Sequence, residues 1–296
     1  MTNTKIKYWL MAIRPRTILA SIGPVILGLS LAYSEFEIFR PIIALLTLTC
    51  AVLLQFATNI ANDYLDFKKG IDTHERIGPK RVTSEGLLSE NEMRSALMLL
   101  LGLAFILGLY LMYVGGFYII LIGLLSLYFS YGYTGGPFPL SYHGLGEASA
   151  LLFFGIFAVT GTSYLQSGHV SHLSLILGTS VGFISAAILA INNLRDLYTD
   201  KKNGKRTLAV RIGENNQRKL IVLFVTLPLI INFFLAIVFT NYFLFFTIIA
   251  IAPFASVYRK ILKEKISPIF NQYLGKTAVY LFLFSILTSL ALITKK

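Results

Sequence analysis

Long runs of apolar residues recur along the whole chain, separated by short polar connections. A helix needs about 20 residues to cross a hydrocarbon core of about 30 Å, and these runs are long enough. Because backbone polar groups must be paired inside lipid, and the runs lack the alternation of a membrane barrel, they predict helices. Nine spans are expected, at residues 17–33, 41–61, 94–114, 116–133, 147–165, 173–194, 219–240, 242–259 and 274–294. The pattern therefore predicts an all-α bundle of about nine transmembrane helices.

The composition agrees with a membrane bundle. Hydrophobic residues make up 55% of the 296 residues and charged residues only 14%, whereas soluble domains average about 25% charged residues. This balance excludes an ordinary soluble enzyme and the disordered and fibrous classes.

The distribution of basic residues predicts the topology. With nine spans, the N-terminus and the even-numbered connections share one face, and 23 of the 26 Lys and Arg residues lie there, leaving Arg40, Lys295 and Lys296 opposite. By the positive-inside rule this face, with the N-terminus, is cytoplasmic. The net charge of +12 is then mainly a topology signal, and no nucleic acid partner is expected.

Two clusters of Asp and Asn lie at cytoplasmic ends of predicted helices. Carboxylates at the centre of a membrane helix cost about 2.5 to 3.5 kcal/mol each, so acids near membrane depth indicate function. The clusters comprise Asn62, Asp63, Asp66 and Asp72 after the second span, and Asn192, Asp196 and Asp200 after the sixth. Spacings of four place Asn192, Asp196 and Asp200 on one face of a continuing helix, and Asn62 and Asp66 repeat the first step.

The repeated spacing indicates an internal duplication within a single domain of residues 1–296. The first half covers about 1–134 and the second about 147–259. Such a repeat brings the two acidic ends together across a central cavity. We expect this cavity to open to the cytoplasm and, for an apolar substrate, laterally to lipid.

The residue types in both clusters favour a hard cation and a diphosphate. Mg²⁺ prefers oxygen ligands and is usually held by one or two carboxylates together with substrate phosphates. Basic residues follow each cluster, among them Lys68, Arg81, Lys205 and Arg206, and such cations bind phosphate oxygens. A basic run at a cytoplasmic helix end is also a common topology signal, so each cation has that alternative explanation.

At these residues the sequence resembles the UbiA-type intramembrane aromatic prenyltransferases. Within them it is most similar to the 1,4-dihydroxy-2-naphthoate polyprenyltransferases of menaquinone synthesis. The superfamily pattern is Asn62-Asp63-x-x-Asp66 and Asp196-x-x-x-Asp200. The narrower resemblance rests on Arg14-Pro15-Arg16-Thr17, Gln55 with Asn59-Ile60-Ala61-Asn62-Asp63-Tyr64, Arg76-Ile77-Gly78-Pro79, Tyr133-Thr134-Gly135-Gly136-Pro137, Tyr142-His143-Gly144-Leu145-Gly146 and Gly204-Lys205-Arg206-Thr207-Leu208-Ala209.

Two departures from the superfamily pattern occur. Gly70 stands where many members carry an Asp, and no lysine follows Tyr131 or Tyr133 within the fourth connection. Both differences are usual in the naphthoate branch, so they argue against a 4-hydroxybenzoate acceptor.

The resemblance implies transfer of an all-trans polyprenyl group from its diphosphate to 1,4-dihydroxy-2-naphthoate, with loss of CO₂, giving a demethylmenaquinol. It implies Mg²⁺ held by Asp63, Asp66, Asp196 and Asp200. It also implies substrate-binding roles for Arg16, Asn62, Lys68, Arg81, Asn192, Lys205 and Arg206. The expected catalytic residues are Asp66, Asp72, Tyr131, His143 and Asp196.

Other functions stay open at this point. Another acceptor, such as 4-hydroxybenzoate or homogentisate, would use the same diphosphate site. A cation-coupled secondary transporter would also carry paired acids, but near the bilayer midplane, whereas both clusters here lie at one face beside cations. Glycines within the spans, among them Gly102, Gly108 and Gly155, either make room for an isoprenoid tail or permit close helix packing.

Overall fold

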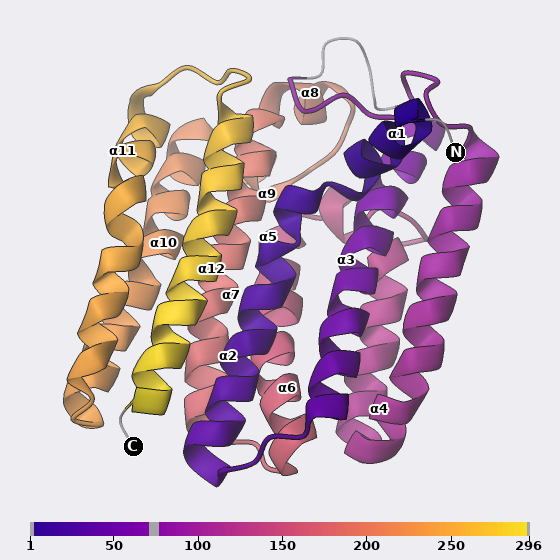
Figure 1. Cartoon of the computed structure of the whole chain (residues 1–296). Coiled ribbons are helices and arrows are strands. Elements are labelled where there is room, and N and C mark those ends of the chain that lie inside the picture. The colour runs from indigo at the N-terminus through magenta and orange to yellow at the C-terminus, as the bar shows by residue number, and fades with distance from the viewer. Residues whose placement is uncertain (1–2, 71–76, 295–296) are drawn as a thin grey trace.

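The structure is a computed structural model that describes residues 3–70 and 77–294. All regular structure in these ranges is helical (Figure 1). The elements are α1 (Asn3–Ile13), η1 (Pro15–Thr17), α2 (Leu19–Phe36), α3 (Pro41–Lys68), α4 (Glu90–Gly132), η2 (Leu140–Tyr142), α5 (Gly146–Leu151), η3 (Leu152–Phe157), α6 (Ala158–Ser167), α7 (His172–Arg195), α8 (Leu197–Lys202), α9 (Leu208–Ile212), α10 (Glu214–Val238), η4 (Tyr242–Phe254), α11 (Ala255–Lys263) and α12 (Phe270–Thr294). The all-α fold class is confirmed.

Eight helical segments of the described chain are long and apolar enough to cross a membrane. One of them, α4, has 43 residues, which would extend about 65 Å as a straight helix. It folds back at Gly116, whose backbone is not helical (φ 61°, ψ −150°). Met112, before this turn, packs on Gly123, after it, and the Met112 Cε lies 2.5 Å from the position a Cβ of Gly123 would take. The two arms match the predicted spans 94–114 and 116–133, and counted separately they make nine crossings in the described residues.

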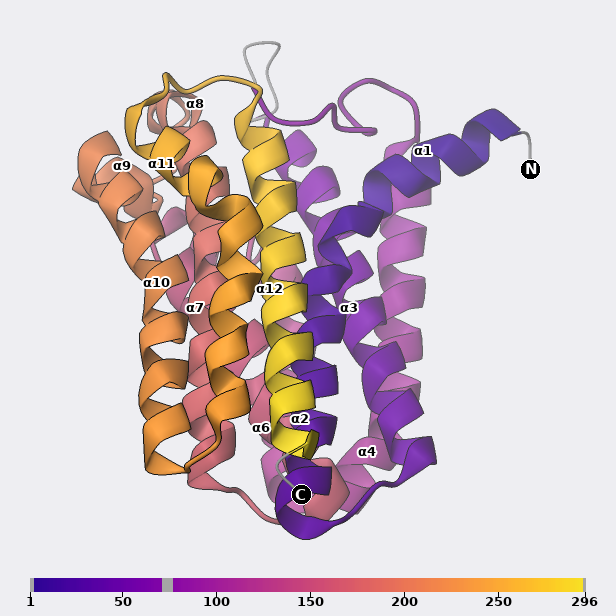
Figure 2. The ribbon, with the colours of Figure 1, turned by 60° about the vertical axis from the view of Figure 1, so that its left-hand side comes forward.

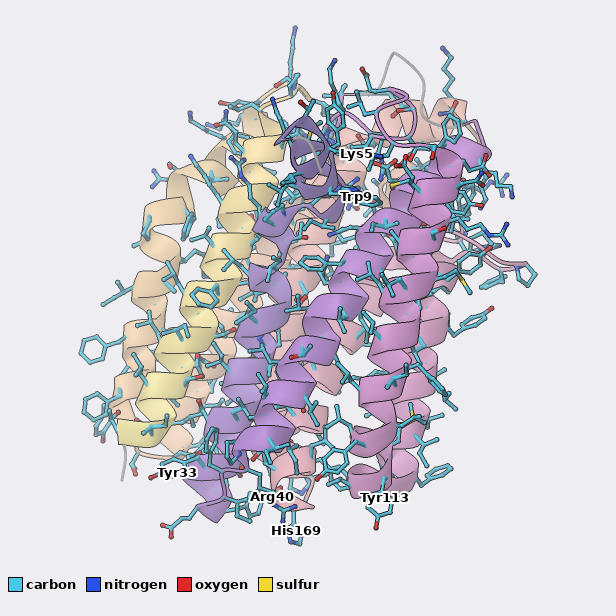
Figure 3. All side chains as sticks on the ribbon, turned by 45° about the vertical axis from the view of Figure 1, so that its right-hand side comes forward. Lys5, Trp9, Tyr33, Arg40, Tyr113 and His169 are labelled. Carbon is cyan, nitrogen blue, oxygen red and sulfur yellow. The ribbon has the colours of Figure 1, made fainter. Side chains whose placement is uncertain are left out.

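The helices run side by side, so that α1 and the end of α12 lie at opposite ends of the bundle (Figures 1 and 2). An odd number of crossings requires this arrangement. Figure 3 places Lys5 and Trp9 at one end and Arg40, Tyr113 and His169 at the other. Arg40 is thus separated from the basic N-terminal segment, as the charge distribution predicted.

The short helix α1 was not expected from the sequence. It lies across one end of the bundle instead of running through it (Figure 2). Tyr8 and Trp9 pack against buried residues of α3 and α4, while Ile6 and Leu10 are about half exposed, at 46% and 49%. This division of apolar side chains between protein and surroundings is typical of a helix in the membrane interface.

Glycine allows the second half of the bundle to pack closely. A Cβ at Gly155, in η3, would lie 2.3 Å from the Cα of Gly182 in α7. Gly155 therefore serves helix contact and not tail space. At Gly108, in α4, a Cβ would meet no atom within 4 Å.

Candidate active site

A cavity of about 660 Å³ lies between the helices of the first half on one side and α5, η3, α6, α7 and the start of α12 on the other. Along α3 its wall extends from Asp66 to Thr47, a rise of about 28 Å. The end near Asp66 is bordered by polar and charged side chains. Toward Cys50 the wall becomes apolar, with residues such as Leu111, Met112 and Phe157. The cavity therefore has a polar head and an apolar body, as a substrate with a charged group and a long hydrocarbon tail requires.

Asp66 lies at the polar head and is only 3% exposed. It occupies the last turn of α3, one helical turn beyond Asn62, so both face the cavity. The Oδ2 atom accepts a hydrogen bond from Nη2 of Arg81 at 3.1 Å, and Nζ of Lys205 lies 4.0 Å from it. The Oδ1 atom is buried without a hydrogen-bond partner. A buried carboxylate with one unused oxygen fits a ligand that supplies positive charge.

Asp63, one residue after Asn62, points to the loop that follows α3. Its Oδ1 accepts from the backbone N–H of Thr83 at 3.1 Å and from the Thr83 hydroxyl at 2.6 Å, and its Oδ2 from the N–H of Val82 at 3.1 Å. These bonds fix the loop segment that begins at Arg81. The Asp63 carboxylate thus holds the loop that presents Arg81 to the cavity.

The second acidic cluster is organised by Arg195, which is 2% exposed. Its guanidinium binds Asp196 through two nitrogens. It also donates to Oδ1 of Asn192 at 2.8 Å and to Oδ1 of Asn271 at 2.6 Å. Arg195 therefore supplies the positive charge opposite Asp196, and it joins the end of α7 to the start of α12.

Lys205 brings the two clusters together. Its backbone N–H donates to the carbonyl of Asp200 at 2.8 Å, while its side chain reaches toward Asp66. Asp200, in α8, is 6% exposed. The acidic ends of α3 and of α7–α8 thus meet across the polar head of the cavity.

Lys69 and Lys205 share an aromatic neighbour, the ring of Tyr142. The Nζ atoms lie 4.3 Å and 5.6 Å from its centroid, within cation–π range. Nζ of Lys69 also donates to the carbonyl of Thr134 at 2.5 Å. Burial lowers the pKa of Lys69, the charge of Asp66 opposes that shift, and Lys205 adds to it. Together with Arg81 these lysines form a basic surface around Asp66.

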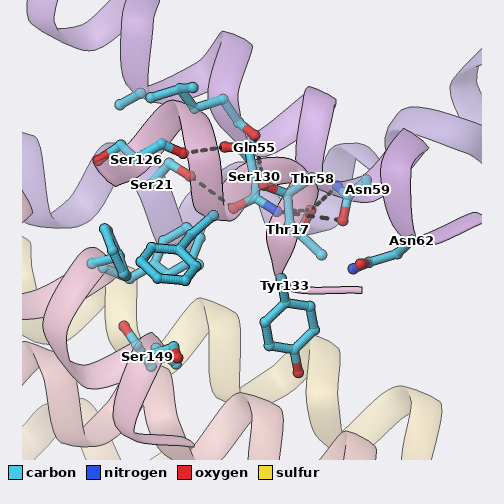
Figure 4. Close-up of a pocket in the computed structure, with 18 of the residues that line it drawn as sticks. Thr17, Ser21, Gln55, Thr58, Asn59, Asn62, Ser126, Ser130, Tyr133 and Ser149 are labelled. Atoms are coloured by element: carbon cyan, nitrogen blue, oxygen red, sulfur yellow. Dashed lines mark hydrogen bonds between the residues drawn. The ribbon is translucent and has the colours of Figure 1, made fainter. Parts of the chain in front are cut away.

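Tyr133 reaches the cavity from the end of α4, and Figure 4 shows its ring among the residues that line the cavity. A tyrosine hydroxyl is protonated at neutral pH. The hydroxyl of the next residue, Thr134, donates a hydrogen bond to Oδ1 of Asn62.

A polar network lies deeper along the same wall (Figure 4). The Gln55 amide accepts from Ser21 at 3.1 Å and donates to Thr17 at 3.2 Å and Asn59 at 3.4 Å. Asn59 donates to Thr17 and to the carbonyl of Ile13, both at 2.9 Å. These bonds tie the turn between α1 and α2 to α3, so the wall of the cavity is fixed in place.

Comparisons with known proteins identify the family. A model of the UbiA prenyltransferase family matches residues 21–293. A 1,4-dihydroxy-2-naphthoate octaprenyltransferase of Escherichia coli is 40% identical over 71% of this chain and 70% of its own length. The enzyme of that name from Bacillus subtilis is 33% identical over 68% and 64%. The chain belongs to the UbiA prenyltransferase family.

Solved structures share the fold of this UbiA prenyltransferase. A UbiA homologue from Archaeoglobus fulgidus, bound to DMAPP and Mg²⁺, gives a TM-score of 0.62 at 16% identity, covering 97% of this chain and 99% of its own. A homologue from Aeropyrum pernix gives 0.66 at 15% identity, covering 94% and 97%. The resemblance to this family, and with it the transfer of a polyprenyl group, is confirmed.

The structure brings most of the expected substrate-binding residues of this prenyltransferase to one cavity. Those on its wall are Arg16, Asn62, Asp66, Arg81, Asn192 and Lys205. Asp196 and Asp200 do not line the cavity, but Asp196 binds the wall residue Arg195, and the Asp200 carbonyl accepts from the backbone of the wall residue Lys205. Asp72 falls outside the described residues.

Four expected residues of the UbiA prenyltransferase lie away from the cavity wall. Lys68 is exposed and sits 5.9 Å from the Tyr64 ring centroid, Arg206 is exposed, and Tyr131 is 40% exposed. His143 stacks on Phe138 at 3.8 Å, and its Nδ1 lies 2.9 Å from the carbonyl of Pro139. None of the four borders the cavity, and their assigned roles stay predictions.

Three residues at the site were missed by the sequence reasoning. They are Thr134, Arg195 and Asn271. Arg195 was counted only among the topology charges, although an arginine inside the Asn192–Asp196 step was a usable signal. Asn271 carried no signal, because its contact with Arg195 joins segments 76 positions apart.

The donor set around Asp66 fits a magnesium ion. The buried, unpartnered Oδ1 of Asp66 and the oxygens of Asn62 and Asn192 are hard ligands. No three His, Cys, Asp or Glu residues of the described chain gather into a metal site by themselves. Mg²⁺ held by a few protein oxygens, waters and substrate phosphates needs no such cluster.

Proposed function

We propose that this UbiA prenyltransferase transfers a polyprenyl group from its diphosphate to 1,4-dihydroxy-2-naphthoate, with loss of CO₂ and dependence on Mg²⁺. The observation that carries the proposal is the polar head of the cavity, where an unpartnered Asp66 oxygen stands among Arg81, Lys69 and Lys205. The names of the relatives at 33–40% identity support the naphthoate acceptor. The solved homologue with DMAPP and Mg²⁺ supports the metal and the diphosphate.

The residues of the polar head bind and orient the diphosphate. Arg81 and Lys205 already face Asp66, so they lie within reach of phosphate oxygens beside that carboxylate. Asp66, with Asn62 and Asn192, would hold Mg²⁺, and Asp196 and Asp200 would complete the negative surface. When bound, Mg²⁺ neutralises charge on the leaving diphosphate and acts as a Lewis acid.

Asp63, which the sequence predicts to be a metal ligand, contributes by fixing the loop of Arg81. The three hydrogen bonds from Val82 and Thr83 occupy both of its oxygens. This role places Arg81 at a defined position relative to Asp66, which diphosphate binding requires.

The reaction forms a bond between the first prenyl carbon and the ring carbon that carries the carboxylate. The bond from the prenyl carbon to the diphosphate oxygen breaks, and the electron pair leaves with diphosphate. The ring recovers its aromaticity when the carboxylate departs as CO₂. Tyr133 and Phe129 line the cavity, where aromatic faces stabilise allylic cation character and exclude water.

The chain is a multi-pass membrane protein, and we propose the cytoplasmic membrane with the polar head facing the cytoplasm. The support is the distribution of 23 of the 26 basic residues on that face.

The deciding experiment supplies purified protein with polyprenyl diphosphate, 1,4-dihydroxy-2-naphthoate and Mg²⁺. The expected result is a prenylated naphthol together with CO₂, and neither product when EDTA is present. Parallel reactions with 4-hydroxybenzoate and homogentisate test the alternative acceptors. A folded protein that prenylates neither naphthoate nor another acceptor would contradict the proposal.

A further inference from the structure

A buried carboxylate lies next to the cavity and has no part in the diphosphate site. Glu147, in the first turn of α5, is 3% exposed. Its Oε1 accepts from Nδ2 of Asn193 at 3.0 Å and from Nε2 of Gln217 at 3.0 Å. Its Oε2 is buried without a hydrogen-bond partner, and no lysine or arginine of the described chain forms an ion pair with it. Three separate helices, α5, α7 and α10, meet at this carboxylate.

The Glu147 carboxylate is costly to bury, because one of its oxygens has no partner. A carboxylate in a low-dielectric interior is normally paired with a cation or fully hydrogen-bonded. Gln217 cannot supply more, because its second amide hydrogen bond goes to the carbonyl of Ala190 at 3.2 Å. Of the two amides that bind the Glu147 carboxylate, Asn193 is the one that borders the cavity. The carboxylate therefore influences the cavity through the Asn193 amide.

The contact with Glu147 determines how the Asn193 amide is oriented. Because Nδ2 is directed at the carboxylate, Oδ1 is directed away from it. In the described part of the chain nothing donates a hydrogen bond to Oδ1. Asn193 thus offers the cavity a hydrogen-bond acceptor whose basicity is raised by the negative charge behind the amide.

Gly146 lies between the Asn193 amide and the Tyr133 hydroxyl. A Cβ at Gly146 would lie 3.0 Å from the Tyr133 hydroxyl and 3.7 Å from Nδ2 of Asn193. Both groups therefore border the same small volume, between the polar head and the apolar body. An aromatic ring in that volume meets the Asn193 amide and the hydroxyl of Tyr133.

We propose that Asn193 binds a ring hydroxyl of the aromatic acceptor through Oδ1, and that Glu147 is the positioning residue that fixes and polarises the Asn193 amide. The inference rests on the proposed function, because it concerns the acceptor of that reaction. It adds the residues that recognise the ring.

The chemistry of the acceptor explains why such a contact accelerates the reaction. As the ring carbon attacks, the hydroxyl oxygen donates electron density to the ring and its proton becomes more acidic. A strong acceptor at that proton stabilises the developing positive charge, and a fixed negative charge behind it adds to the effect. No bond forms or breaks at Asn193 or Glu147, and the hydroxyl keeps its proton.

The test compares acceptors and variants in one assay. Wild-type protein is given 1,4-dihydroxy-2-naphthoate and the two analogues that lack either hydroxyl, 1-hydroxy-2-naphthoate and 4-hydroxy-2-naphthoate. A site built to bind a hydroxyl should reduce kcat/KM for one analogue at least about 30-fold. Asn193→Leu should remove most of this discrimination, and its KM for the prenyl diphosphate should stay within about twofold of wild type.

Glu147→Gln tests the positioning role, because glutamine keeps the size and the acceptor oxygen of Glu147. It should reduce kcat for the dihydroxy acceptor about 10-fold with little change in the KM for prenyl diphosphate. Asn232→Leu is the matched control. Asn232 is a buried amide that bonds Thr247 and Thr288 in the second half of the bundle, away from the cavity. It should lower the thermal stability without changing the choice of acceptor.

The outcomes separate the two proposals. If wild-type protein forms no prenylated naphthoate, the proposed function fails and this inference fails with it. If wild-type protein forms product but accepts both analogues as well as the dihydroxy compound, the inference alone is overturned. Retained discrimination in Asn193→Leu overturns it as well. Should Asn193→Leu not fold, Asn193→Ser and the analogue series on wild-type protein give the same decision.

Discussion

Nζ of Lys205 lies 4.0 Å from Oδ2 of Asp66, although 139 residues separate them in the chain. Lys205 follows the second acidic cluster and Asp66 ends the first. The contact brings the two acidic clusters to one place, where Lys205 and Arg81 balance the negative charge of Asp66 until a substrate arrives. A carboxylate with cations already around it is prepared for a diphosphate, which exchanges protein–protein contacts for protein–phosphate ones.

Asp66→Asn should abolish turnover. The change removes the charge that would hold Mg²⁺ and leaves Arg81 and Lys205 unbalanced, so kcat/KM is expected to fall at least about 100-fold. The measurement is product formation over a series of Mg²⁺ concentrations. Glu85→Gln is the control, because Glu85 is an exposed acid that pairs with Lys80 at 3.3 Å and does not line the cavity. Near-normal turnover in Asp66→Asn would exclude it as a metal ligand.

Asp63→Asn should have a different effect. An amide nitrogen would replace one of the two oxygens that accept from Val82 and Thr83, leaving a buried donor unsatisfied, at a cost of about 1–3 kcal/mol. The loop would then hold Arg81 less firmly, and the KM for prenyl diphosphate should rise about 10-fold. The Mg²⁺ concentration for half-maximal activity should not change. A shift in that concentration as large as in Asp66→Asn would support the metal role that the sequence predicts.

The helices were predictable because their signal is local. The nine spans could be read from runs of apolar residues, and even the reversal within α4 was marked by Gly115-Gly116. Helix α1 escaped because its 11 residues are too few to form a span. Its position depends on where Tyr8 and Trp9 find partners in α3 and α4.

The candidate site was predictable only in part, for the same reason. Asp66 and Asp200 were found by spacing along one helix or its continuation. The orientation of Asp63 toward Val82 and Thr83 depends on the path of a loop that carries no periodic pattern. The partnership of Arg195 with Asn271 and that of Glu147 with Asn193 and Gln217 are tertiary contacts, which spacing within one segment does not reveal.

Arg195→Lys should destabilise the protein. Arg195 is buried and binds Asp196, Asn192 and Asn271 through its planar guanidinium. A lysine ammonium cannot reach three partners in that geometry, and disrupting a buried ion pair costs about 3–5 kcal/mol. Thermal unfolding in detergent should show a lower midpoint, with loss of activity at temperatures where wild-type protein is folded.

The control for this prediction is Arg259→Lys. Arg259 is an exposed residue of α11, so the same exchange should change the stability by less than about 0.5 kcal/mol. If Arg195→Lys unfolds at the same temperature as Arg259→Lys and keeps its activity, Arg195 does not organise the second cluster.

Gly108→Phe should shorten the prenyl chain that the enzyme accepts. Gly108 borders the apolar body of the cavity, and the space where its Cβ would stand is open to 4 Å. A phenyl ring there would fill volume that a long tail needs, while a short tail ends nearer to Asp66. We expect kcat/KM for an octaprenyl diphosphate to fall at least about 10-fold relative to geranyl diphosphate.

Gly102→Phe is the matched control, because Gly102 lies on the same arm of α4, also has open space, and does not border the cavity. The measurement is the product yield of both variants with diphosphates of graded length. A loss of the long products in Gly108→Phe alone would show that the tail passes Gly108. An unchanged length preference in Gly108→Phe would mean that the tail leaves the cavity before it reaches α4.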